Sequence, residues 1–163
     1  MILHFKEKQY SWGDTFYILD ENNQRKYWVK SSIFLWGKKW EICDLDKNVL
    51  VVIKNEPKSL LKQKYYVLMN DRKAAAITKE ISLIPKYTIE GLDWQMHGAM
   101  LHEYEMLRNG QEVLSFHREI TRWGDRPVLK VTSPADELLA LAVVMTISYV
   151  MNAKEGGTPT NHL

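Results

Sequence analysis

Short apolar segments alternate with polar turns along the first 132 residues of the chain. A unit recurs in which an aromatic-rich strand is followed by a turn of Asp, Asn or Gly and a second strand. The Asn109-Gly110 turn is the strongest hairpin signal, because both positions tolerate a positive φ. A first strand near residues 3–8 and a last near 127–132 bring the count to about twelve, which is typical of a sandwich or barrel. The predicted hairpins cover residues 16–29, 40–53, 65–77, 87–96 and 104–116.

The pattern changes after the last predicted strand. Ser133, Pro134 and Asp136 predict a helix start, with Ser133 as the cap and Pro134 in the first turn. Residues 138–151 are apolar on nearly every helical face, so this helix must be surrounded by protein or lipid. The run is about fourteen residues, shorter than the roughly twenty that a membrane span needs, which favours a core helix. We therefore predict a mainly β fold, a closed antiparallel barrel of about twelve strands around a buried apolar C-terminal helix.

A single domain accounts for the whole pattern, as expected for 163 residues. Residues 1–152 form the predicted barrel domain, with its central helix at 134–152. The polar, Gly-rich residues 153–163 are expected to form a disordered tail. Apolar residues make up 45% of the chain, which is enough to build one core.

Three motifs carry a resemblance to a known family. They are residues 11–14 (SWGD), residues 86–94 (KYTIEGLDW) followed by Gly98, His102 and Tyr104-Glu105, and residues 136–144 (DELLALAVV). Together they resemble the LURP-one-related proteins, in particular the short bacterial members, over about residues 3–152. That family is grouped with the tubby C-terminal domain, whose members bind phosphoinositides, and with the phospholipid scramblases. The resemblance implies a tubby-like barrel of about twelve strands threaded by an apolar helix.

Two positions depart from the family pattern. The family tends to have Asp near the end of the helix, where this chain has Ser148. It also tends to have a small residue and an aromatic where this chain has Arg126-Pro127. The fold that the resemblance implies is unaffected, but the departures weaken the expectation of a preserved site at the end of the barrel.

Charge is distributed unevenly, although the net charge is only +2. Residues 54–86 hold 8 basic and 3 acidic side chains, a net of +5, whereas residues 87–163 hold 6 basic and 10 acidic, a net of −4. The small net charge excludes a bulk nucleic-acid binder, and the basic segment suits an anionic head group. Lysines that protect a sheet edge and aid solubility are the alternative interpretation. The candidate ligand-binding residues are Lys58, Lys62, Lys64, Arg72, Lys73 and Lys79.

No residue pattern predicts a catalytic centre, a cofactor or a metal site. The chain lacks the nucleophile-elbow and nucleotide-binding glycine motifs. Cys43 is the single cysteine, which suits a reducing compartment and a buried role rather than a reactive one. His97 and His102 lack further ligands at a recognised metal spacing. Residues 1–8 lack the apolar core of a signal peptide, so we expect a cytoplasmic protein.

These observations predict a non-enzymatic binding domain that recognises an anionic phospholipid, or a similar phosphorylated ligand, at the membrane surface. The alternative is a protein-interaction or scaffold domain that uses the barrel surface without a small ligand. An enzyme that acts on a small molecule is the third and least favoured interpretation. The expected partners are therefore an anionic lipid or a protein, with no nucleic acid, and the oligomeric state is left open.

Overall fold

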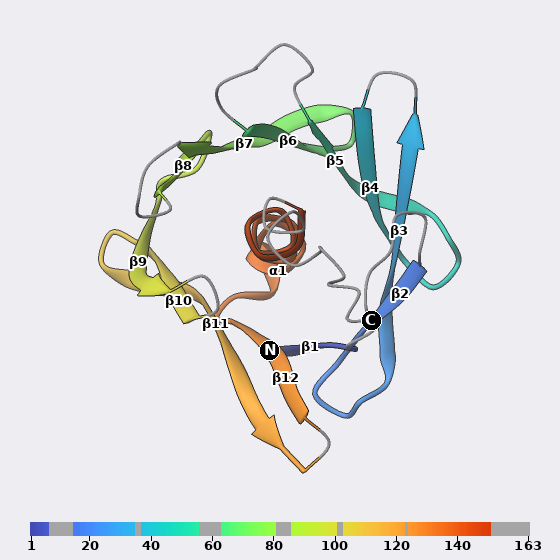
Figure 1. The fold of residues 1–163 in the computed structure, drawn as a ribbon, viewed down its shortest axis with the longest axis vertical. Helices are drawn as coiled ribbons and strands as arrows, with labels where there is room; N and C mark the ends of the chain where they lie inside the picture. Colours follow the sequence, from blue (N-terminus) through green and yellow to red (C-terminus); the bar gives the residue numbers. More distant parts are fainter. Residues whose placement is uncertain are drawn as a thin grey trace, which may run out of the picture.

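The computed structural model describes residues 1–6, 15–34, 37–55, 63–80, 86–100, 103–122 and 124–150. These residues form twelve strands and a C-terminal helical segment (Figure 1). The strands are β1 (Ile2–Phe5), β2 (Thr15–Leu19), β3 (Arg25–Phe34), β4 (Gly37–Cys43), β5 (Val49–Asn55), β6 (Gln63–Met69), β7 (Arg72–Glu80), β8 (Lys86–Glu90), β9 (Trp94–Met100), β10 (Glu103–Arg108), β11 (Gln111–Thr121) and β12 (Gly124–Val131). The helical segment comprises a 3₁₀ turn, η1 (Pro134–Asp136), the α-helix α1 (Glu137–Met145) and a π-helical turn, η2 (Thr146–Val150).

The twelve strands form one antiparallel sheet that curls into a nearly closed barrel (Figure 1). The first and last strands, β1 and β12, pair with each other, with Leu3 opposite Leu129. At the predicted hairpin turn, Asn109 and Gly110 have φ values of 51° and 78°, as expected. The mainly β fold with about twelve strands and one C-terminal helix is therefore confirmed.

The sheet has two edges, β8 and β9, although these strands follow each other in the sequence. No backbone pairing joins them within the described ranges, so the fourth predicted hairpin forms two strands that do not pair with each other. The link between them begins at Gly91, which has a φ of 88°. A Cβ at Gly91 would lie 2.9 Å from the carbonyl oxygen of Ala74, so the link packs against β7. This close packing on β7 replaces the tight turn that the sequence pattern indicates.

The helical segment lies in the middle of the barrel, where it forms the centre of the core (Figure 1). Side chains of the strands alternate between inside and outside, so Val67 and Ile77 point inward and are fully buried. Leu141, Val144 and Ile147 of the helical segment are also fully buried. The predicted burial of an all-round apolar helix is thus correct. No helix in the described part of the chain is long and apolar enough to cross a bilayer.

The helix begins close to the predicted position but without the predicted cap. Pro134 occupies the first turn as expected, whereas the side chain of Ser133 makes no capping hydrogen bond. The predicted helix of 134–152 is described as far as Val150, and the predicted tail, 153–163, lies outside the described residues. Interactions with the barrel wall, described below, hold the start of the helix instead of a local cap.

Candidate functional site

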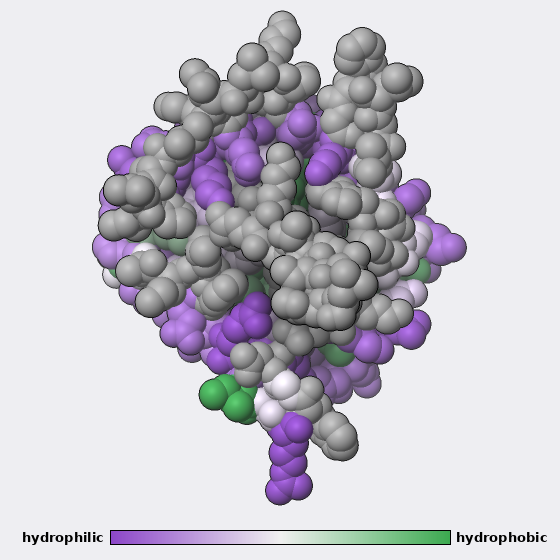
Figure 2. All heavy atoms as spheres, viewed as in Figure 1, coloured by the Kyte–Doolittle hydropathy of each residue, from purple (hydrophilic) through white to green (hydrophobic). Residues whose placement is uncertain are grey.

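The outer surface of β4 to β7 carries lysines from four strands around one tyrosine. In β6, Tyr65 and Val67 are buried, so strand alternation points Tyr66 outward. The backbone register places Lys54 of β5 opposite Tyr66, and Lys39 of β4 opposite Lys54. Figure 2 shows hydrophilic residues around most of the visible rim of the barrel, with some of them over β6 and β7. We call this group the basic face; it comprises Lys39, Lys54, Lys64, Tyr66 and Lys73.

The ring of Tyr66 organises two of these lysines. The Nζ atom of Lys73 lies 4.8 Å from the ring centroid and that of Lys64 lies 5.7 Å from it. Both distances fall within the range of cation–π attraction, which is about 6 Å. The ammonium groups of both lysines therefore lie close to the Tyr66 ring, which places two cations on this outer surface.

Two of the four lysines of the basic face have carboxylate partners. Lys39 pairs with Glu41 at 2.7 Å, and Lys64 pairs with Glu90 at 3.1 Å. Lys54 and Lys73 are exposed, and neither has a carboxylate partner among the described residues. These two ammonium groups are the charges that an anionic ligand could reach without displacing an ion pair.

The structure describes four of the six residues that the sequence indicated as ligand-binding, and it does not bring all four together. Lys64 and Lys73 lie together at the ring of Tyr66. Arg72 begins β7 and Lys79 lies near its other end, so these two side chains are far apart along the strand. Ile77 is fully buried, and Lys79, two residues further on, follows the same inward side of the strand away from the basic face. The remaining two candidates, Lys58 and Lys62, lie outside the described residues.

Sequence reasoning counted Lys54 in the basic segment but not among the candidate residues, and it missed Lys39, because it considered the charges of one hairpin separately from those of its neighbour. Both residues come from the preceding hairpin, β4–β5, which pairs with β6 through β5. A signal for them was present, since the buried Trp40 and Ile53 next to them mark both lysines as outward-facing. Alternation combined with the pairing of consecutive hairpins would have placed them beside Tyr66.

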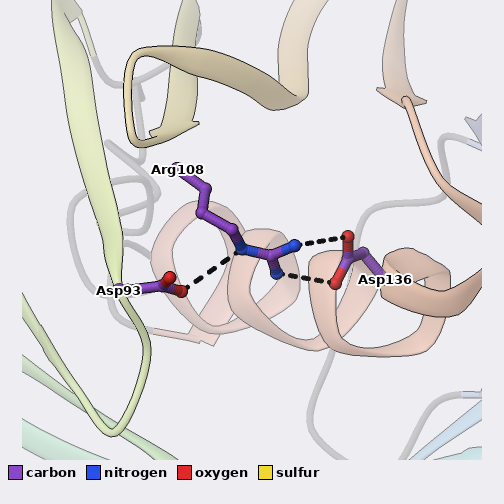
Figure 3. A network of polar contacts seen from close by, with 3 residues as sticks. All are labelled: Asp93, Arg108 and Asp136. Carbon is purple, nitrogen blue, oxygen red and sulfur yellow. Dashed lines mark hydrogen bonds and ion pairs between the residues drawn. The ribbon is translucent and has the colours of Figure 1, made fainter.

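A second polar cluster joins the start of the helix to the barrel wall (Figure 3). Nη2 of Arg108, at the end of β10, donates a hydrogen bond of 2.9 Å to Oδ1 of Asp136, and Nη1 donates one of 3.3 Å to Oδ2. Nε of Arg108 donates to Asp93, in the link between β8 and β9, at 3.3 Å. One guanidinium therefore holds together the helix start, β10 and the link between the edge strands.

The buried carboxylate of Glu137 is held from β3, as a second anchor for the helix. The hydroxyl of Tyr27 donates to Oε1 of Glu137 at 2.5 Å, and the ammonium of Lys26 lies 2.7 Å from the same atom. Burial, followed by the hydrogen bond to Glu137, raises the pKa of Tyr27 above its ordinary value. Because the charge of Glu137 is neutralised by Lys26, this cluster anchors the helix and offers no free base for catalysis.

The other chemically reactive candidates have packing roles or remain outside the described ranges. Cys43 is 2% exposed, and burial, with the nearby Glu41 and Asp44, raises the pKa of its thiol. A protonated, buried thiol is a poor nucleophile. His102 lies outside the described residues, and no group of three His, Cys, Asp or Glu within them is arranged to hold a metal ion.

Comparison with known proteins identifies the family. A family model described as LURP-one-related matches residues 1–148. Uncharacterized protein YxjI of Bacillus subtilis (strain 168) is 27% identical over 151 residues, which cover 91% of this chain and 93% of that protein. An X-ray structure of a protein from Arabidopsis thaliana shares the fold with a TM-score of 0.60 at 14% identity, covering 93% of this chain and 90% of that one. The chain described here belongs to the LURP-one-related family.

Proposed function

We propose that this chain is a non-enzymatic ligand-binding domain that docks on anionic phospholipid head groups through the basic face. The observation that supports the proposal is the presence of two exposed lysines without carboxylate partners, Lys54 and Lys73, beside the outward ring of Tyr66. Membership of the LURP-one-related family and the tubby-like barrel favour a binding domain over an enzyme. Binding of this kind makes the domain a peripheral protein at the membrane surface.

Electrostatics and aromatic anchoring both favour a lipid surface as the ligand. Each basic side chain near an anionic membrane contributes about 1 kcal/mol of binding free energy. A tyrosine suits the interface, because its ring is apolar and its hydroxyl group is polar. The Nζ atoms of Lys64 and Lys73 lie 5.7 and 4.8 Å from the ring centroid, so positive charge and aromatic surface occur together. The basic face thus offers a charged, partly apolar patch of the sort that a head-group region can accommodate.

The test is sedimentation with liposomes of phosphatidylcholine, with and without phosphatidylserine, at low salt and at 1 M salt. The variant Lys54→Gln/Lys73→Gln removes two charges, so we expect about a thirtyfold loss of affinity at low salt. Binding should weaken in high salt for the native chain, since the Debye length falls to about 3 Å at 1 M. Equal binding by the variant and the native chain would show that a different surface contacts the lipid.

A matched control removes two charges elsewhere. Arg122→Gln/Lys130→Gln, in β12 and the turn before it, changes the net charge by the same amount and should leave the affinity unchanged if the basic face is the binding surface. Titration with inorganic pyrophosphate distinguishes a lipid surface from a soluble phosphorylated ligand. If the affinity for pyrophosphate equals the affinity for the anionic liposomes, the same lysines bind a soluble phosphorylated ligand. If neither probe binds, the scaffold alternative replaces this proposal.

A further inference from the structure

The seam between β8 and β9 is the one place where the described sheet is not continuous. Many inward side chains of the other strands are fully buried, as for Ile77 and Met106, although Met69 of β6 is also only partly buried. At the seam, the inward-facing Ile89 of β8 and Met96 of β9 are only partly buried, although both pack against the core. The barrel therefore has an apolar strip that its own strands leave partly uncovered.

Unpaired sheet edges border this apolar strip on both sides. A sheet edge presents backbone N–H and C=O groups that another extended chain can pair with. An acyl chain could cover the apolar side chains but could not satisfy these backbone groups, whereas an extended peptide can do both. The requirement for backbone hydrogen bonding thus favours a polypeptide as the occupant.

The outer surface on the β10 side of the seam is acidic, whereas on the other side Lys86 of β8 pairs with Glu80 at 3.8 Å. Glu103 and Glu105 of β10 are exposed, and neither has a cationic partner among the residues that the structure describes. Asp93, in the link, is 64% exposed and shares Arg108 with Asp136. A strand paired to β9 would lie about 10 Å from β10, two strand spacings, which a lysine side chain can span. The charge of this surface favours basic side chains on the outward side of the occupant.

A second copy of the chain does not fit these requirements. Its lysine-rich strands, β4 to β7, are each paired on both sides within their own sheet, and its unpaired edges, β8 and β9, carry only one lysine between them, Lys86. We propose that the seam between β8 and β9 binds an extended segment of a protein partner, with apolar side chains facing inward and basic side chains facing outward. This inference is independent of the lipid-binding proposal, because it concerns different strands and the opposite charge.

The probe for this proposal is a capped nonapeptide of alternating lysine and valine. Its control is a peptide of the same composition with the lysines and valines in two separate blocks, which has the same charge but cannot face apolar side chains inward. At millimolar concentration, the alternating peptide should shift the amide resonances of β8 and β9 and slow their hydrogen exchange. The block peptide should leave these amides unchanged.

The charge contribution is tested with the variant Glu103→Gln/Glu105→Gln. The variant removes two exposed ion pairs with the lysines of the peptide, which together contribute about fivefold to the affinity. The alternating peptide should therefore bind about five times more weakly to this variant. The matched control Glu21→Gln/Asp46→Asn removes two carboxylates from other turns and should bind the peptide like the native chain.

Three results would overturn the proposal. One is equal binding of the alternating and block peptides, which would indicate a general attraction to cations. Another is the absence of amide shifts in β8 and β9 at millimolar peptide. The third is protection of β8 and β9 that rises with protein concentration in the absence of peptide, which would assign the seam to a second copy.

Discussion

Removal of one buried hydroxyl group, by Tyr104→Phe, should lower stability at neutral pH and raise it at alkaline pH. Tyr104 lies on β10 and is 4% exposed. Its hydroxyl oxygen is 2.9 Å from the hydroxyl oxygen of Ser148 in the helical segment. Burial raises the pKa of Tyr104 above its ordinary value, and the neighbouring Tyr87 adds to this effect, whereas the hydrogen bond to Ser148 opposes it.

The magnitudes follow from these contacts. Loss of a neutral hydrogen bond costs about 1 kcal/mol, so the variant should be less stable than the native chain by about that amount at pH 7. Because the folded pKa is raised, the stability that Tyr104 contributes is complete below the unfolded value of about 10 and is lost as the pH rises above it. Above this pH the free energy of unfolding of the native chain falls by roughly 1.4 kcal/mol per pH unit because of Tyr104, whereas the variant has no hydroxyl group to ionise at this position. The two stability curves should therefore cross between about pH 10.5 and 11.

The assay is urea unfolding of both proteins at several pH values from 7 to 11, followed by circular dichroism. Other tyrosines and lysines titrate in both proteins, so their effects largely cancel in the difference. Curves that stay parallel over the whole range would refute the reasoning, since they would mean that Tyr104 ionises as easily in the folded chain as in the unfolded one.

Two further predictions concern the anchor of the helix and the link between the edge strands. In a double-mutant cycle of Arg108→Gln and Asp136→Asn, urea unfolding should show that the two losses of stability are not additive, because either variant alone breaks the ion pair; additive losses would contradict the anchoring role. Gly91→Ala and Gly110→Ala both place alanine at a positive φ, but only Gly91 has a backbone atom within 3 Å of the new Cβ. Thermal unfolding should therefore show a loss for Gly91→Ala at least about 1 kcal/mol greater than for Gly110→Ala, and equal losses would contradict the close packing of the link on β7.

The basic face shows how much a charge pattern along the chain can predict about which residues lie together in the fold. The sequence correctly located a basic hairpin, and two of its residues, Lys64 and Lys73, do lie together at one ring. The same hairpin also contains Arg72 and Lys79, which lie at opposite ends of β7. Lys54 entered the group only through the register of β5 against β6. Proximity on a sheet depends on which residues are opposite one another, and a count of charges along the chain does not contain that information.

The start of the helix shows a similar division. Pro134 and the apolar residues that follow it correctly predict where the helix begins and that it is buried, because both signals are contained in the segment itself. Ser133 occupies the N-cap position as expected, but its side chain makes no capping hydrogen bond, because the orphan groups of a helix start can be satisfied in several ways. Arg108 anchors the helix start from 28 positions earlier in the sequence, which no local motif indicates.

Local patterns in the chain are sufficient to predict the strands, most of the hairpin turns and the central helix. Alternating apolar positions, the Asn-Gly turn and an all-round apolar run act over a few residues, so they can be recognised without a partner segment. The unpaired edges of β8 and β9, and the surface shared by the lysines of four strands, emerge only when the whole sheet is assembled. Those features depend on how the sheet curls and on the register between strands, which arise from the packing of all twelve strands around the helix.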